Sequence, residues 1–152
     1  MTTAIGQGDT LVTPLHMAMI TSAVANSGIM MKPYLISRVE STEGNLVSET
    51  KPEIYRELMS VSEAEILNEF MRGTVTSGTG SALSWNSYSV AGKTGSAEYE
   101  TNGSMGTHSW FVGFSNVDDP DIAVAIIAED GGTGSSTAVP IAQQLFDAYY
   151  YR

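Results

Sequence analysis

The segment from Val90 to Glu98 reads Val-Ala-Gly-Lys-Thr-Gly-Ser-Ala-Glu and places one lysine among hydroxyl-bearing and glycine residues. Its β-branched and small residues, flanked by tyrosines, predict a strand over residues 88–99. Side chains alternate between the two faces of a strand, so Lys93, Gly95 and Ala97 share one face. Glycine inside a strand is typical of close approach by a ligand or another backbone. This face therefore presents an ammonium group beside bare backbone, which suits an anionic ligand; the alternative is an amphipathic strand with a solvated lysine.

The lysine-threonine pair also occurs in the phosphate-binding loop, whose pattern is glycine, four residues, glycine, lysine and threonine or serine. That pattern requires a glycine at position 87, where this chain has Ser87. The lysine of such a loop also opens a helix, whereas Lys93 lies within a predicted strand. The sequence therefore does not predict a nucleotide-phosphate site.

Composition restricts the classes of function. The chain has 152 residues, about one domain and enough to bury a core. Its 17 acidic and 7 basic residues give a formal net charge of -10, so no nucleic-acid partner is expected. The chain has no cysteine, which excludes disulfides, thiolate zinc sites and a cysteine nucleophile. His16 and His108 are too distant in sequence to suggest a zinc pair, and we expect neither metal nor cofactor.

The elements before the lysine strand are two helices and a hairpin. Thr13 suits an N-cap position with Pro14 first in the helix, and residues 15–25 are apolar almost all round, which predicts a buried helix. Residues 34–41 and 46–49 predict a hairpin around a Glu-Gly-Asn turn.

A short helix is predicted over residues 53–58. A longer one follows, because Ser62 and Glu65 form a capping box, and it runs to about Val75. Its apolar stripe is predicted to face the core. The stripe consists of Ile66, Leu67, Phe70 and Met71.

Two further strands and a helix follow. Residues 108–114 alternate, and residues 122–128 form a continuous apolar run, which predicts a central strand covered on both faces. Ser136 or Thr137 is predicted to cap the final helix, which ends near Tyr150. Consecutive strands joined by short turns are antiparallel and need helices to cover their faces. The predicted fold class is α+β, with three C-terminal antiparallel strands and a small hairpin.

Six short segments carry a further signal: Ala4–Asp9, Thr13–Leu15, Ala25–Gly28, Gly78–Gly80, Ala91–Glu98 and Trp110–Phe114. Together, and in this order, they resemble the C-terminal half of the transpeptidase domain of penicillin-binding proteins, closest to the class B type. The resemblance covers nearly the whole chain. It implies a partial β-lactamase/transpeptidase-like fold in which residues 1–152 are part of a single domain.

The resemblance implies roles for the lysine strand. In this family a serine attacks a D-alanyl-D-alanine stem peptide or a β-lactam, and the acyl group then passes to an amine of a neighbouring peptide. Lys93 would attract the substrate carboxylate and assist proton transfer, and the Thr94 hydroxyl would hydrogen-bond that carboxylate. Alternation places Thr94 on the face opposite Lys93, so this role needs a local twist of the strand. Gly95 would keep the face open, the Ser96 N–H would be one of two oxyanion-hole donors, and Ala97 would continue the substrate-binding strand.

The family's nucleophile is not expected within this chain. Its serine-x-x-lysine and serine-x-asparagine elements precede the glycine-glutamine-glycine segment, and so should lie upstream of Met1. Residues 48–51 fit the first pattern, but Pro52 prevents a helix from continuing there. Residues 84–86 fit the second pattern, but they lie too close to Lys93. We interpret both matches as coincidental, and we interpret His108 as a strand residue packed near Trp110.

The sequence thus predicts part of a serine D,D-transpeptidase that is inactive alone, because the nucleophile is missing. Two alternatives are a fragment of a class D β-lactamase or β-lactam sensor, and a non-catalytic module that binds a peptide or a partner. The intact protein is expected to bind stem peptides and β-lactams outside the cytoplasm. No apolar run in this chain could span a membrane, so an anchor is expected elsewhere. The strand at residues 122–128 is expected to support self-association through a free edge.

Overall fold

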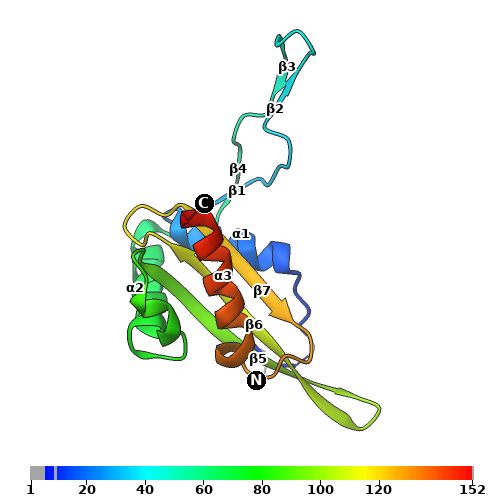
Figure 1. Cartoon of the computed structure of the whole chain (residues 1–152), viewed down its shortest axis with the longest axis vertical. Helices are drawn as coiled ribbons and strands as arrows, with labels where there is room; N and C mark the ends of the chain where they lie inside the picture. The colour runs from blue at the N-terminus through cyan, green and yellow to red at the C-terminus, as the bar shows by residue number, and fades with distance from the viewer. Residues whose placement is uncertain (1–5, 9, 152) are drawn as a thin grey trace.

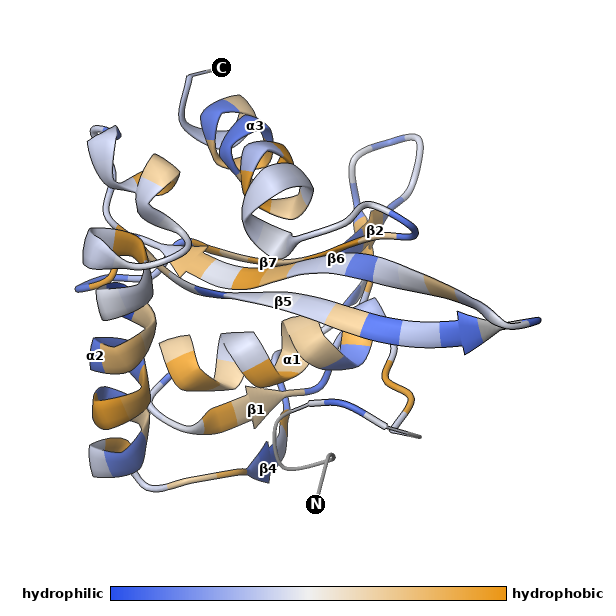
Figure 2. Ribbon diagram, turned by 90° about the horizontal axis from the view of Figure 1, so that it is seen from below, coloured by the Kyte–Doolittle hydropathy of each residue, from blue (hydrophilic) through white to orange (hydrophobic). Residues whose placement is uncertain are grey.

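The computed structural model describes residues 6–8 and 10–151 and confirms an α+β fold (Figure 1). Its centre is an antiparallel sheet in the order β5-β6-β7. These strands are β5 (Val90–Thr101), β6 (Ser104–Ser115) and β7 (Ile122–Ala128). The helices are α1 (Pro14–Ala25), α2 (Val61–Ser77) and α3 (Val139–Tyr150). Figure 2 shows α3 on one face of the sheet and α1 on the other, with α2 beside β5.

The β5–β6 hairpin is longer than predicted. Asn102 and Gly103 both have positive φ, 54° and 77°, and an Asn-Gly pair with this geometry makes the tightest common hairpin turn. The two strands therefore pair without interruption from Val90 opposite Ser115 to Thr101 opposite Ser104.

Strand β7 has the predicted bounds, but its predicted central position is wrong. It lies at one edge of the described sheet, and β6 is the central strand. Helix α1 and helix α3 contact its two faces. The apolar run therefore reflects two covered faces, a property that an edge strand shares with a central one.

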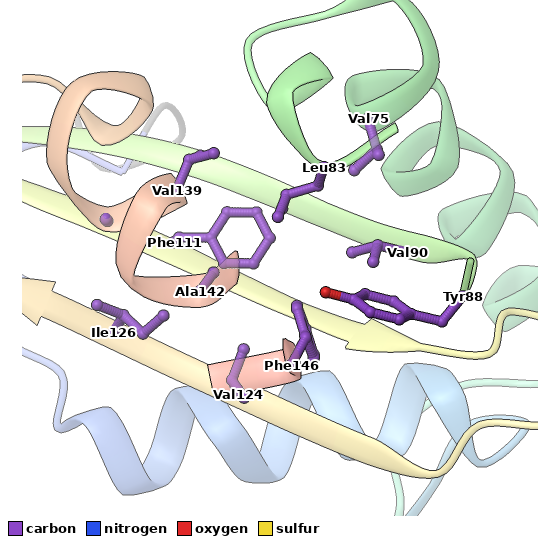
Figure 3. Packing of buried hydrophobic residues seen from close by; sticks show 11 residues of the cluster. Val75, Leu83, Tyr88, Val90, Phe111, Val124, Ile126, Val139, Ala142 and Phe146 are labelled. Carbon is purple, nitrogen blue, oxygen red and sulfur yellow. The ribbon is translucent and has the colours of Figure 1, made fainter. Parts of the chain in front are cut away.

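The main core lies between the sheet and α3 (Figure 3). Phe111 from β6 and Phe146 from α3 are fully buried there. Tyr88 closes one end of this core, stacks on Tyr150 with ring centroids 4.6 Å apart and donates a hydrogen bond of 2.7 Å to Asp147. Burial and this bond raise the pKa of Tyr88. A smaller cluster on the opposite face consists of Val24, Ala91 and Phe114.

Helix α1 begins as predicted, since the Thr13 hydroxyl accepts a hydrogen bond of 3.1 Å from the His16 N–H. Its predicted burial is confirmed only in part. Ala23 and Val24 are buried, whereas Leu15 is 61% exposed. Part of the apolar surface of α1 is thus left exposed by the described residues.

Helix α2 begins two residues earlier than predicted. Ser60 is its N-cap, and a reciprocal capping box joins Ser60 to Glu63, whose carboxylate accepts from the Ser60 N–H at 2.8 Å. Hydrogen bonds from Ser60 lower the pKa of Glu63. A tertiary contact lies just before this start, since the Leu58 N–H donates a hydrogen bond to the Gly28 carbonyl.

The predicted apolar stripe of α2 is not its buried face. Ile66, Leu67 and Phe70 are exposed, whereas Ala64 and Val75 are buried, and Val75 belongs to the main core. Only Met71 from the predicted stripe packs against a core cluster.

Two small antiparallel pairs lead away from the body, the first beside α1 and the second at the end of a projecting arm (Figure 1). One pairs β1 (Ile29–Met31) with β4 (Ile54–Glu57), and the other pairs β2 (Arg38–Glu40) with β3 (Leu46–Glu49). The predicted hairpin is confirmed, although its first strand is shorter. The predicted helix at residues 53–58 is wrong. Helix nucleation is unfavourable for so short a segment, and β4 forms there instead by pairing with β1.

The predicted cap of α3 is also wrong. A π-helical turn, Gly134–Ala138, precedes α3, and Thr133 lies at its start. Another short helix, Ser81–Trp85, precedes β5. Within the described residues, no helix has the length and apolar character needed to cross a membrane.

Candidate active site

The edge of β5 that faces away from β6 lies beside the predicted site residues. We call it the outer edge of β5. Lys93 is exposed, and its ammonium group donates a hydrogen bond of 2.7 Å to the Thr94 carbonyl. An exposed ammonium held this close to the backbone places positive charge along the strand, where an anionic ligand could meet it.

Lys93 and Thr94 lie on opposite faces of β5. Lys93 pairs with Val112, whereas Thr94 pairs with the buried Phe111, and the register shows no bulge there. The Thr94 hydroxyl lies 2.5 Å from the Thr79 hydroxyl. This contact joins the Gly78–Gly80 loop to the lysine strand.

Gly95 lies between Trp110 of β6 and the turn that precedes α3. A Cβ atom built on Gly95 would lie 3.1 Å from the Trp110 Cβ, and one built on Gly134 would lie 2.7 Å from the Gly95 carbonyl oxygen. The Gly134 N–H also donates to the Ser96 hydroxyl at 3.3 Å. The turn before α3 therefore packs directly on the backbone of the candidate site.

The Ser96 peptide groups face the outer edge. The Ser96 carbonyl accepts a hydrogen bond of 2.8 Å from the Gln7 side-chain amide, whose oxygen accepts from the Glu98 N–H at 3.2 Å. In an extended strand the N–H and carbonyl of one residue point the same way. The Ser96 N–H therefore also points to the outer edge, and Lys93 and this donor lie along one side of the strand.

Comparison with known proteins places this geometry in a family. The model of the penicillin-binding protein transpeptidase domain matches residues 1–147. The chain belongs to this family. Peptidoglycan D,D-transpeptidase PbpA of Mycolicibacterium smegmatis is 36% identical over 91% of this chain. Peptidoglycan D,D-transpeptidase MrdA of Haemophilus influenzae is 31% identical over 95% of it.

The solved structure of penicillin-binding protein A from M. tuberculosis as a ceftriaxone acyl-enzyme superposes with a TM-score of 0.87 and 32% identity. That comparison covers 97% of this chain and 34% of the solved one. The two curated relatives are covered over only 29% and 25% of their lengths. The chain thus spans about a third or less of the transpeptidases it resembles.

Neither internal match to the family's serine motifs lies in an α-helix. Ser48 lies in β3 on the projecting arm, distant from β5 (Figure 1). The Ser84 hydroxyl donates to the Ser81 carbonyl at 2.6 Å within a short helix. Neither serine begins an α-helix that would carry a lysine on the same face.

Ala97 is half-buried and pairs with His108 of β6 in the central sheet. His108 does not stack on Trp110; its ring stacks on Tyr99, with centroids 4.3 Å apart, and accepts a hydrogen bond from the Asp130 N–H. The hydrogen bond from the Tyr99 hydroxyl to Asp130 raises the pKa of Tyr99.

In the described part of the chain, no three His, Asp or Glu side chains are grouped so as to hold a metal ion.

Sequence reasoning missed the contributions of Gln7 and Gly134. In the sequence, Gln7 stands out only as part of a segment that resembles the family. The glycines on either side of it, Gly6 and Gly8, have positive φ of 75° and 93°, so glycine on both sides was the one local signal of an unusual backbone conformation. The sequence around Gly134 is rich in glycine and serine, and such a composition does not reveal a packing contact.

Proposed function

We propose that this chain is the C-terminal part of a single transpeptidase domain in a serine D,D-transpeptidase. The intact protein would crosslink peptidoglycan stem peptides and be acylated by β-lactams. The observation that carries the proposal is the outer edge of β5, where the Lys93 ammonium and the Ser96 N–H face the same side. Relatives named peptidoglycan D,D-transpeptidases and acyl-enzyme complexes of a structural neighbour support it. Peptidoglycan lies outside the cytoplasm, and so would the active domain.

Each residue has a role in the proposed reaction. A serine outside this chain forms an ester with the penultimate D-alanine and releases the terminal one; an amine of a neighbouring stem peptide then takes the acyl group. Lys93 attracts the substrate carboxylate and assists proton transfer. The Ser96 N–H donates to the oxyanion that develops on the attacked carbonyl. Gly95 admits the ligand close to the backbone, and Ala97 continues the binding strand.

Thr94 has a more conditional role. Its hydroxyl would hydrogen-bond the substrate carboxylate, yet it lies on the face opposite Lys93 and contacts Thr79. Reaching the carboxylate requires the substrate to approach past the edge of the strand, or a rotation of the hydroxyl away from Thr79. The Thr79 contact makes the Gly78–Gly80 loop a support for this position.

Intact-mass spectrometry after incubation with penicillin G tests the proposal. We expect no adduct on the 152-residue chain, because the nucleophile lies outside it, and one adduct per molecule on the full-length protein. An unacylated full-length protein would refute the function. An adduct on Ser48 or Ser84 would instead show that the nucleophile lies within this chain.

The curated relatives also favour the transpeptidase over the two alternatives. Both named relatives are D,D-transpeptidases rather than β-lactamases or sensors. A class D β-lactamase would release the penicillin adduct rapidly, and a non-catalytic module would form none. Persistence of the adduct in the same mass measurement therefore separates the transpeptidase from a β-lactamase and from a non-catalytic module. A β-lactam sensor would also keep its adduct, and it differs from a transpeptidase in not transferring an acyl group from a stem peptide to an added amine.

We also propose that the isolated chain self-associates through β7. Its outer edge has no pairing strand among the described residues, and an unpaired apolar edge is a template for another chain. Light scattering on the isolated chain at rising concentration should show a growing mass. A monomer that persists at the highest concentration would contradict this.

A further inference from the structure

The Gln7 side chain forms hydrogen bonds with the outer edge of β5 in the way that the backbone of a neighbouring strand would. Its amide nitrogen donates to the Ser96 carbonyl, and its amide oxygen accepts from the Glu98 N–H. An extended peptide that adds to a sheet edge uses backbone donors and acceptors of this kind. One side chain therefore occupies two groups that a peptide lying along β5 would need.

We propose that Gln7 is a specificity-determining gate on this edge. It lies over Ser96 and Glu98 in the free protein, and a ligand whose own amide pairs with the Ser96 carbonyl must displace it. A ligand that lacks such an amide leaves Gln7 in place. The inference rests on the proposed function, because it concerns the ligands of the same site.

The chemistry of the two bonds makes displacement necessary. The Gln7 amide nitrogen lies 2.8 Å from the Ser96 carbonyl oxygen, so a ligand N–H that approaches this oxygen along the edge of the strand meets Gln7 first. The Glu98 N–H has a single hydrogen, and the Gln7 oxygen accepts it. A peptide that pairs along β5 as far as Glu98 therefore competes directly with Gln7.

The backbone around Gln7 is shaped to present its side chain. Gly6 and Gly8 both have positive φ, a conformation that glycine adopts without strain. Gln7 itself is half-buried, whereas both glycines are exposed. The local chain thus turns the one amide side chain toward β5 and leaves its neighbours in solvent.

The size of the effect follows from the bonds that are exchanged. Two neutral hydrogen bonds must break before the ligand can form its own, and each has a modest net value in water. Removing Gln7 should therefore accelerate binding of amide-bearing ligands by about two- to tenfold. Ligands without the amide should be unaffected.

Penicillin G and imipenem are suitable probes. Both form acyl-enzymes with penicillin-binding protein A, a structural neighbour. Penicillin G carries an amide on its β-lactam ring, and imipenem carries a hydroxyethyl group there. In the full-length protein, Gln7→Ala should raise the second-order rate constant of acylation by penicillin G about two- to tenfold and leave that of imipenem unchanged.

Two further variants sharpen the test. Gln7→Glu keeps an acceptor for the Glu98 N–H but loses the donor to Ser96, so it should accelerate penicillin G while leaving the exchange of the Glu98 amide hydrogen slow. Gln144→Ala removes an exposed glutamine on α3 and should change neither rate. Equal slowing with both antibiotics in Gln7→Ala would show a supporting role for Gln7 and overturn the gate, as would unchanged rates.

Hydrogen exchange separates the gate from the proposed function. In the chain itself, the Glu98 amide hydrogen should exchange slowly and become fast in Gln7→Ala, whether or not the protein is acylated by anything. Equal exchange in the two proteins would refute the contact. A full-length protein that neither antibiotic acylates would refute the function, while exchange would still decide the contact.

Discussion

Replacing Lys93 with methionine in the full-length protein should lower the second-order rate constant of acylation by penicillin G about 100- to 10,000-fold. Positioned proton transfer and electrostatic stabilisation each contribute factors of about this size, and the Lys93 ammonium is proposed to supply both. The chain carries a formal net charge of -10, so an anionic ligand depends on local positive charge to approach β5. Stopped-flow measurement with a fluorescent penicillin gives the rate constant.

The fold should tolerate this substitution. Lys93 is exposed, and the only hydrogen bond of its ammonium group within the described residues goes to the Thr94 carbonyl. Methionine keeps the length of the side chain and removes the charge. The unfolding midpoint should therefore stay close to that of the parent.

Lys32→Met is the matched control. Lys32 is also exposed, forms an ion pair of 3.1 Å with Glu53 and lies beside the projecting arm, away from β5. Lys32→Met changes the net charge by the same amount as Lys93→Met. A loss of acylation rate that occurs only in Lys93→Met therefore depends on the position of Lys93 and not on the net charge. Similar rates in the two variants would remove Lys93 from the mechanism.

The lysine strand and its partner could be predicted because their signals are local. Alternation of β-branched and small residues determines the strand period, and each of β5, β6 and β7 was located within a few residues. The helix starts show the limit of this approach. Ser60-x-x-Glu63 and Ser62-x-x-Glu65 are equivalent capping boxes in sequence, so the local pattern does not show that the helix uses the first.

The completed site could not be predicted because its contacts join distant segments. Gln7 is separated from Ser96 and Glu98 by 89 and 91 positions. The Gly134 N–H reaches Ser96 across 38 positions. No local pattern encodes such a pairing; the family resemblance placed the segments in order, and the fold then determined which of their atoms meet.

Gly134→Ala should reduce the free energy of unfolding by about 1–3 kcal/mol, since an added Cβ forces backbone to move in a packed interior. That Cβ would lie 2.6 Å from the Trp110 carbonyl oxygen and 2.9 Å from the Gly95 nitrogen. Both contacts are with backbone, so a rotamer change cannot relieve them. The backbone of Gly134 does not have a positive φ, so the loss reports steric contact rather than conformational strain.

The surrounding turn has little freedom to move. The Ser109 hydroxyl donates to the Thr133 carbonyl at 2.7 Å and accepts from the Ala138 N–H at 3.0 Å. The Thr137 hydroxyl donates to the Gly131 carbonyl. These bonds hold the turn before α3 against β5 and β6, so the added methyl group must push on the strand that carries the candidate site.

Gly73→Ala provides the opposite expectation in the same chain. A Cβ at Gly73 meets no atom within 4 Å, and alanine is favoured over glycine inside a helix by about 0.5–1 kcal/mol. Urea unfolding should therefore show a lower midpoint for Gly134→Ala and a higher one for Gly73→Ala. Equal unfolding midpoints for Gly134→Ala and Gly73→Ala would mean that the turn before α3 is not packed tightly against the Gly95 backbone. If Gly134→Ala also slows acylation of the full-length protein while Gly73→Ala does not, this packing contact controls the geometry of the lysine strand as well as its stability.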